Sequence, residues 1–178
     1  YWVTGAPRFG HLAARCRAVL LGRLMQADGR LPEYFDSDLD PLPRKAQQEE
    51  PGHLVEWVSL EAGWQALGLP DAQAGGCFPP GNPLFLAAIA QASPQGFLPD
   101  VAGGATFRLW PQAELIRAGR VMEAQGATIP ANYRPDAVLS RVWPAYFETG
   151  VPGGWYDQRS ANGALISTTM PASSFYHI

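Results

Sequence analysis

Cysteine is scarce in this sequence, with only Cys16 and Cys77 among 178 residues. The two do not form a Cys-x-x-Cys pair, and they could be two buried thiols as easily as one disulfide. We favour reduced thiols, and we therefore expect a cytoplasmic protein.

Long apolar runs and stripes of positive charge are also absent from the sequence. No apolar run approaches the roughly 20 residues that a membrane-spanning helix needs, and Tyr1 does not open a charged-then-apolar signal segment. The 13 basic and 16 acidic residues give a net charge of −3 and are spread along the chain, so no basic stripe could follow a phosphate backbone. We therefore expect neither a membrane nor a nucleic acid as a partner.

The composition that is present is typical of one globular domain over residues 1–178. Hydrophobic residues make up 47% of the sequence, which suffices for a sizeable core in a chain of this length. Glycine and proline are frequent, at 19 and 17 residues, and many of them lie in the connections between apolar periodic segments. The sequence thus predicts helices separated by ordered loops.

Apolar residues at three- and four-residue steps, with proline at several expected helix starts, predict five helices. The expected ranges are about 7–26, 51–68, 84–92, 110–126 and 136–147. Pro144 should kink or shorten the last of these helices. Asn162-Gly163 is a two-residue turn signature, and it predicts a small β-hairpin within residues 153–169.

Aromatic side chains occur in or beside the expected loops. If the helices pair antiparallel, loops at one end share a cleft, where flat rings could stack on sugar rings. For any single aromatic residue, a place in the core or in a lid is the commoner role. The residues concerned are Tyr34, Phe35, Trp110, Trp155 and Tyr156.

Three short motifs stand out along the chain: EPGHLVEW at residues 50–57, RLWPQAE at 108–114 and PASSFYH at 171–177. Together with GRLPEYF at 29–35 and GGWYD at 153–157, they resemble the N-acylglucosamine 2-epimerase superfamily. That superfamily includes acylglucosamine and cellobiose 2-epimerases and the mannose-type aldose-ketose isomerases. The resemblance spans nearly the whole chain.

The resemblance implies an all-α fold, the (α/α)6 barrel, in which two concentric rings of helices carry a sugar site in the loops at one end. Twelve helices of average size would not fit into 178 residues. We therefore expect residues 1–178 to form about half of such a barrel, its C-terminal part, truncated at both ends, with a small β-hairpin near the C-terminus. An Arg and other site residues of the family are expected to lie in the N-terminal half.

The family's chemistry needs a base that removes the C2 proton of an open-chain aldose and an acid that returns a proton. Histidine suits both tasks because its pKa lies near neutrality. The family works through a cis-enediol between two histidines, and its motifs place these at His53 and His177. The resemblance thus implies an isomerase, either a 2-epimerase or an aldose-ketose isomerase, that acts on a small-molecule sugar without a cofactor.

Further site residues follow from helical spacing and from the motifs. Glu56 lies one helical turn beyond His53, and Glu114 lies one turn beyond Trp110, so each carboxylate could orient a histidine or bind a sugar hydroxyl. Trp110 is the expected platform for a sugar ring. Glu50 and Ser173 complete the expected substrate contacts.

An acidic loop lies between the first two expected helices. Its members, Glu33, Asp36, Asp38 and Asp40, are expected to be solvated rather than catalytic. Glu33 alone among them matches the family pattern.

Other readings of the same residues stay open. A glycoside hydrolase or lyase on this architecture would use Glu56 with Glu114 or Asp157 as acid and base, and an inactive remnant would bind sugar without turning it over. A metal site of His53 with Glu49, Glu50 and Glu56 is disfavoured, because it does not supply a full coordination shell. Few Arg or Lys lie near the motifs, which favours a neutral hexose, and a homodimer is compatible with the sequence.

Overall fold

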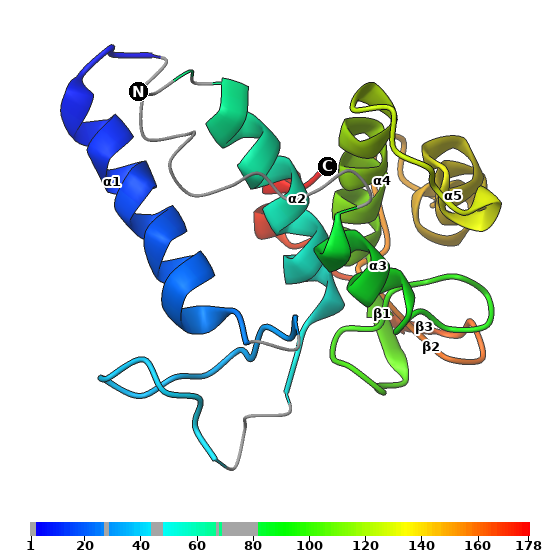
Figure 1. The fold of residues 1–178 in the computed structure, drawn as a ribbon. Coiled ribbons are helices and arrows are strands. Elements are labelled where there is room, and N and C mark those ends of the chain that lie inside the picture. Colours follow the sequence, from blue (N-terminus) through cyan, green and yellow to red (C-terminus); the bar gives the residue numbers. More distant parts are fainter. Residues whose placement is uncertain (1–2, 27–28, 44–47, 67, 69–81) are drawn as a thin grey trace.

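Proline opens four of the five α-helices in the described part of the chain (Figure 1). These are α1 (Pro7–Val19), α2 (Pro51–Ala66), α3 (Pro83–Ile89) and α5 (Pro135–Val142), whereas α4 (Leu109–Ala124) has Pro111 in its first turn. A first-turn proline loses no intrahelical hydrogen bond and has the helical φ already fixed. The computed structural model describes residues 3–26, 29–43, 48–66, 68 and 82–178, and it confirms the five predicted helices.

Two of the helices continue as π-helical turns. Leu20–Leu24 follows α1, and Trp143–Phe147 follows α5. The sequence predicted continuous helices over both regions, with a distortion at Pro144, which lies in the second π-helical turn. Proline cannot donate the backbone hydrogen bond of a regular helix, so the change of helix type after α5 occurs where the sequence forbids the α pattern.

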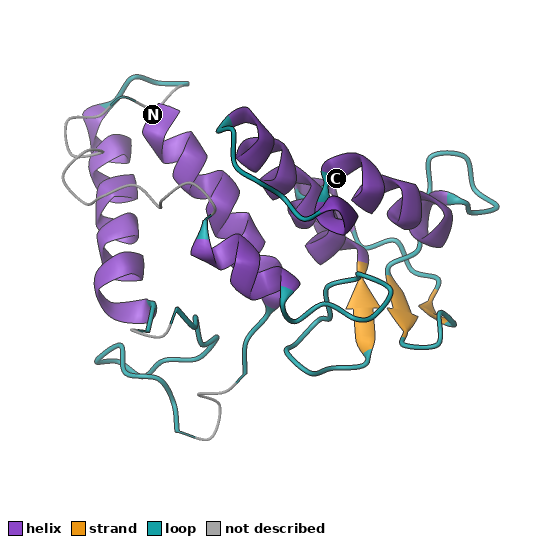
Figure 2. Cartoon of the chain, turned by 45° about the vertical axis from the view of Figure 1, so that its right-hand side comes forward, coloured by secondary structure: helices purple, strands orange, loops and turns teal. Residues whose placement is uncertain are grey.

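The helices stand side by side in the order α1, α2, α4, α5 (Figures 1 and 2). α2 packs most extensively on α4 and also packs on α3, and α4 packs on α5. The core lies between these elements and includes Leu54, Val55, Val58, Phe85, Leu109, Leu115, Ala118, Val138, Val142 and Tyr146. In the described part of the chain, no helix is long and apolar enough to cross a bilayer.

The apolar face predicted for the first helix is mostly exposed. Leu12 is 59% exposed and Cys16 is also exposed, while Leu20 is buried. Arg17 is buried instead, because its guanidinium donates two hydrogen bonds, of 2.7 and 2.8 Å, to the carboxylate of Glu61 on α2. The periodicity predicted the helix correctly, but no described element covers most of its apolar side. Cys77 lies outside the described residues.

A small antiparallel sheet sits at one end of the helices. β1 (Thr106–Arg108), β2 (Gln158–Ser160) and β3 (Leu165–Ser167) pair in that order. The β2–β3 hairpin confirms the predicted one, and Gly163 in its turn has a φ of 81°. β1 was not predicted, because three residues are too few to show the alternation of a strand. It leads directly into α4.

Gln112 ties the loop before β1 to the first turn of α4. Its side chain is wholly buried, accepts a hydrogen bond from the backbone N–H of Leu98 at 2.9 Å, and donates to the Leu98 carbonyl at 2.7 Å. It also donates to the carbonyl of Arg108 at 3.0 Å. One side-chain amide therefore holds the loop and the start of α4 together.

Replacing Gln112 by Met should lower the free energy of unfolding by about 2–4 kcal/mol, because the N–H and carbonyl of buried Leu98 would lose their partner. Urea unfolding of the complete protein measures this. Gln125→Met, at the exposed end of α4, is the matched control and should change stability by less than about 0.5 kcal/mol. Equal effects of the two substitutions would show that the hydrogen bonds of the Gln112 side chain do not stabilise the fold.

Candidate active site

The helix starts of α2 and α4 and the last residues of the chain come together in space. His53 lies in the first turn of α2, Trp110 lies in the first turn of α4, and His177 follows the 3-10 helix η5 (Ala172–Tyr176). The backbone N–H of Leu109 donates to the carbonyl of Asp157 at 2.9 Å, which fixes the start of α4 beside the segment that leads into β2. Residues of three separate motifs thus form one cluster.

His53 is paired with Glu33. Its Nδ1 lies 3.0 Å from both carboxylate oxygens of Glu33, and Glu33 also accepts a hydrogen bond from the backbone N–H of Glu50 at 3.1 Å. The hydrogen bond that Nδ1–H donates to Glu33 raises the pKa of His53, against the opposing effect of partial burial. With Nδ1 engaged, Nε2 is the imidazole nitrogen left to face a substrate.

The turn that carries Glu33 is closed by its own acidic residues. Asp36 accepts hydrogen bonds from the backbone N–H groups of Asp38 and Asp40, at 2.9 and 3.0 Å, in the manner of an Asx turn. These three aspartates are exposed, as predicted for the acidic loop. The prediction was wrong for Glu33, whose side chain is only 15% exposed because it packs against His53.

His177 is paired with Glu114 in the same manner. Its Nδ1 lies 2.8 Å from Oε1 of Glu114, which is wholly buried in α4. Burial raises the pKa of Glu114, and the hydrogen bond to His177 and the charge of Arg117, 3.2 Å away, act in the opposite direction. The second oxygen, Oε2, is buried without a hydrogen-bond partner among the described residues. Each histidine is therefore held through Nδ1 by a carboxylate from a different element.

Trp110 contacts both imidazoles. Its ring centroid is 5.0 Å from that of His53 and 5.1 Å from that of His177, and both pairs of rings are tilted by 38°. Because both histidines touch the same indole, their ring centroids are at most about 10 Å apart. The two imidazoles therefore lie in one region of the structure.

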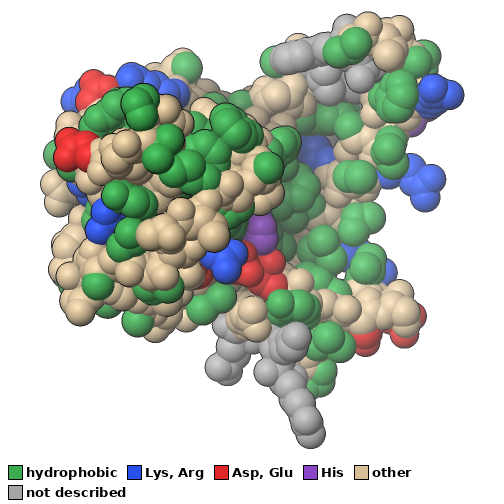
Figure 3. Space-filling view, turned by 180° about the vertical axis from the view of Figure 1, so that it is seen from behind, with side chains coloured by type: hydrophobic (Ala, Val, Ile, Leu, Met, Phe, Trp, Pro, Cys, Tyr) green, Lys and Arg blue, Asp and Glu red, His purple; other side chains and the backbone are tan. Residues whose placement is uncertain are grey.

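Additional carboxylates make this region acidic. Oε2 of Glu50 is 3.8 Å from His53 Nδ1, and burial raises the pKa of Glu50, with a further contribution from the charge of Glu33. Burial also raises the pKa of Asp157, which is hydrogen-bonded to Ser174. In the view from behind, histidine and acidic side chains are visible together in the hollow between α1 and the rest of the molecule (Figure 3).

The remaining expected site residues lie in different places. Glu56 is not the carboxylate that holds His53, since it groups with Glu114 and His177, where the possible ligand atoms lie within 4.8 Å of one another. Ser173 is exposed on η5, while its neighbour Ser174 is buried. Trp155 is a buried core residue in edge contact with Phe175, so its role is packing.

The metal site considered from the sequence is not assembled as such. Glu49 contacts Gln91 and Arg30, away from His53. The groups with metal-ligand spacing among the described residues are Glu33 with Glu50 and His53, and Glu56 with Glu114 and His177. In both groups the histidine Nδ1 already lies beside a carboxylate. A histidine held in this way is suited to proton transfer.

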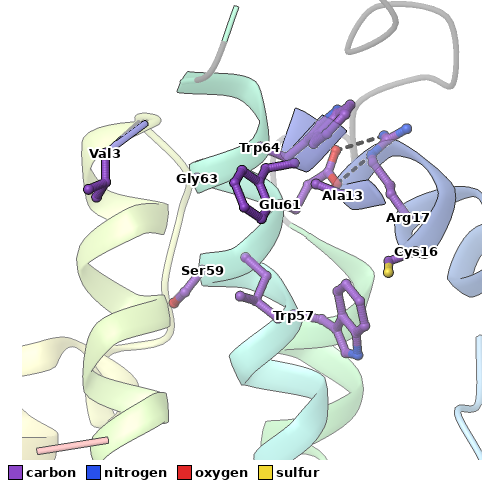
Figure 4. A pocket seen from close by; sticks show the side chains of 11 residues that line it. Val3, Ala13, Cys16, Arg17, Trp57, Ser59, Glu61, Gly63 and Trp64 are labelled. Carbon is purple, nitrogen blue, oxygen red and sulfur yellow. Dashed lines mark hydrogen bonds and ion pairs between the residues drawn. The ribbon is translucent and has the colours of Figure 1, made fainter. Parts of the chain in front are cut away.

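Each histidine borders its own cavity. The cavity at His53 measures about 200 Å³ and includes Glu33, Phe35 and Trp57, whereas that at His177 measures about 350 Å³ and is largely apolar. A separate cavity of about 540 Å³ lies between α1 and α2, where Trp57 and Trp64 border the Arg17–Glu61 ion pair (Figure 4). Its charged groups are already paired with each other, so its chemistry is that of an apolar pocket.

Glu33 is the site residue that spacing rules missed. It precedes His53 by 20 residues and reaches it across a loop, so no helical or strand period connects the two positions. The signal available in the sequence was that Glu33 alone of the acidic loop belongs to a family motif. That signal should have separated it from the exposed aspartates.

Replacing Glu33 by Gln should lower the pKa of His53, because a neutral amide stabilises the imidazolium less than a carboxylate does. A pKa raised in the folded protein stabilises the fold fully below the ordinary value near 6.5, and this contribution is lost as pH rises through the folded value. The free energies of unfolding of wild type and E33Q should therefore differ most at acidic pH and converge as pH rises. Urea unfolding from about pH 5 to 9 measures the difference.

The control for this pH series is Glu148→Gln, at an exposed position after α5. Its effect on stability should not follow the titration of a histidine. A difference between wild type and E33Q that grows with rising pH would contradict the assigned pair.

The whole chain matches one protein family. Residues 1–178 match N-acylglucosamine 2-epimerase (GlcNAc 2-epimerase). Mannose-6-phosphate isomerase of Rhizobium meliloti (strain 1021) is 31% identical over 189 residues, which cover 99% of this chain and 46% of that protein. The chain thus spans about half the length of this relative.

Solved structures share the fold at low sequence identity. The crystal structure of D-mannose isomerase matches 98% of this chain and 47% of its own, with a TM-score of 0.73 and 19% identity. The crystal structure of a sugar epimerase from a ruminal bacterium matches 91% and 42%, with a TM-score of 0.69 and 15% identity. These matches confirm the predicted fold as about half of a helical barrel, and the chain belongs to the N-acylglucosamine 2-epimerase family.

Proposed function

We propose that this chain carries the proton-transfer site of a sugar isomerase or epimerase that interconverts an aldose with its ketose or 2-epimer. The observation that carries the proposal is the pair of histidines, each bound through Nδ1 to a carboxylate and both in contact with Trp110. Such pairs leave two Nε2 atoms for acid/base work on one substrate. Membership of a family of sugar epimerases supports the same chemistry.

The two imidazoles can carry the proton transfers at carbon that this reaction needs. One Nε2 takes the proton from C2 of the open-chain aldose, the C–H electron pair forms the C1–C2 double bond, and the carbonyl oxygen takes a proton to give a cis-enediol. A proton returned to C1, as the C2 hydroxyl gives up its own, yields the ketose. A proton returned to the opposite face of C2, as the C1 hydroxyl gives up its own, yields the 2-epimer.

The two pairs differ in a way that suits opposite tasks. The pKa of His53 is raised by Glu33, which favours an imidazolium that donates a proton. Glu114 is wholly buried behind His177, where it holds the imidazole with Nε2 outward as a proton acceptor. We assign His53 as the acid and His177 as the base of the first step, with the roles exchanged in the reverse reaction.

The charges around the site favour a neutral sugar. In this proposal, Glu50, Glu56 and Asp157 are the candidate acceptors for hydroxyl groups. Two nearby cations of the described residues are already engaged, since Arg117 lies 3.2 Å from Glu114 and Arg108 lies 3.8 Å from Asp100. The R. meliloti relative is named for mannose 6-phosphate and a structural neighbour for D-mannose, so mannose and its phosphate are the first pair to compare.

Proton NMR of sugars incubated with the complete protein in D₂O tests the proposal. Mannose, mannose 6-phosphate, glucose, fructose and N-acetylmannosamine are the substrates to compare. Deuterium should enter C1 or C2 with wild type, and His53→Gln or His177→Gln should slow this exchange by about 10²–10⁴-fold. His11→Gln, on the exposed side of α1, is the matched control and should retain the wild-type rate.

The opposite results would favour the carboxylate mechanism of a hydrolase or lyase. Exchange that survives both histidine substitutions would remove the two-histidine mechanism. Cleavage of a glycoside that is lost in Glu56→Gln or Asp157→Asn, with His177→Gln still active, would establish the alternative.

A further inference from the structure

The indole of Trp110 is seated against the backbone of α2 at Gly52. A Cβ atom placed on Gly52 would lie 2.4 Å from Cη2 and 2.5 Å from Cζ3 of the indole, closer than carbon atoms approach in proteins. The same atom would lie 3.0 Å from Cβ of Pro111, the next residue of α4. Only glycine therefore allows the outer ring of Trp110 to lie at this depth between α2 and α4.

The indole contacts both histidines of the candidate site. His53 follows Gly52 directly in α2 and lies 5.0 Å from the indole, and His177 lies 5.1 Å from it. The two carboxylates hold the imidazoles from their Nδ1 sides, at 3.0 and 2.8 Å. Each imidazole thus contacts both a carboxylate and the indole.

We propose that Trp110, seated on Gly52, is a positioning residue that sets the separation of the two imidazoles, in addition to any contact it makes with sugar. The inference rests on the proposed function, because it concerns the same two histidines. A spacer of fixed size between two proton-transfer groups determines whether both reach the same pair of carbons. A displacement of about 1 Å in such a site can cost about 10²-fold in rate.

The spacer role and a pure platform role predict different kinetics. A platform contributes binding energy to substrate and transition state alike, so its loss raises KM and leaves kcat nearly unchanged. A spacer acts on the alignment of the imidazoles, so its displacement lowers kcat with little change in KM. Gly52→Ala separates the two roles, because it displaces the indole without removing it.

The experiment compares Gly52→Ala, Trp110→Phe and the double variant in the complete protein. Gly52→Ala should lower kcat by about 10–100-fold with KM within about threefold of wild type. Phenylalanine lacks the outer ring that the new Cβ would strike, so Gly52→Ala should have little further effect in the Trp110→Phe background. Gly63→Ala on the same helix, where an added Cβ meets no atom within 4 Å, is the control and should keep wild-type kinetics.

A second readout does not depend on turnover. Both imidazoles lie close to one indole, so its ring current shifts the resonances of their Cε1 protons. The chemical shifts of both protons should therefore change in Gly52→Ala and in Trp110→Phe. They should not move in Gly63→Ala. His53→Gln and His177→Gln assign the two signals by their disappearance.

The outcomes distinguish this inference from the proposed function. A wild-type protein that exchanges no sugar, with both resonances moving as stated, would remove the proposed function and keep the spacer. An active wild type in which Gly52→Ala raises only KM, or adds its full effect to Trp110→Phe, would overturn the spacer. If Gly52→Ala does not fold, Trp110→Phe decides alone, and a shift of neither resonance, or of only one, would overturn the inference.

Discussion

The close approach of α2 to α4 is the constraint on which the site depends. At Gly52 the backbone of one helix touches the indole carried by the other, and this contact brings His53 and Glu114 to the same region. The buried apolar residues of both helices continue the contact away from the site. The candidate site therefore sits at the end of the most extensive helix–helix interface in the described part of the chain.

The site holds its carboxylates at a cost in stability. Burying a carboxylate disfavours its charged form, which is why the pKa of Glu114 is raised. His177 and Arg117 offset part of that cost at Oε1, but Oε2 of Glu114 stays buried without a partner among the described residues. The pair of Glu33 and His53 is more exposed, and its balance of charge and burial raises the pKa of the histidine instead. Two pairs of the same composition thus have different electrostatic properties because of where each lies.

Much of the fold could be predicted because local signals carried it. Proline at helix starts located the helices, and Asn162-Gly163 located the hairpin. β1 could not be predicted from its three residues, since it forms only by pairing with β2, some 50 residues further along the chain. The exposure of the apolar side of α1 could not be predicted for a different reason. Periodicity shows which residues share a side of a helix but not whether another element covers that side.

The candidate site was likewise predictable only in part. Motifs identified His53, His177, Trp110 and Glu114, which the structure brings together. Helical spacing suggested that Glu56 would orient His53 or bind a sugar hydroxyl. The carboxylate that contacts His53 Nδ1 comes instead from Glu33 across a loop, a contact that no local pattern encodes. The contact between Gly52 and Trp110 also joins two motifs that are far apart in sequence. Contacts between segments distant in sequence were the part that required a structure.

A crystal structure of the complete protein with mannitol, an open-chain polyol of the size of a hexose, tests the central claim most directly. The account predicts that C1 and C2 of the polyol lie between the two imidazoles, with each Nε2 within about 3.5 Å of one of these carbons or its hydroxyl. Mannitol bound away from both Nε2 atoms, or held with a carboxylate in place of either histidine, would contradict it.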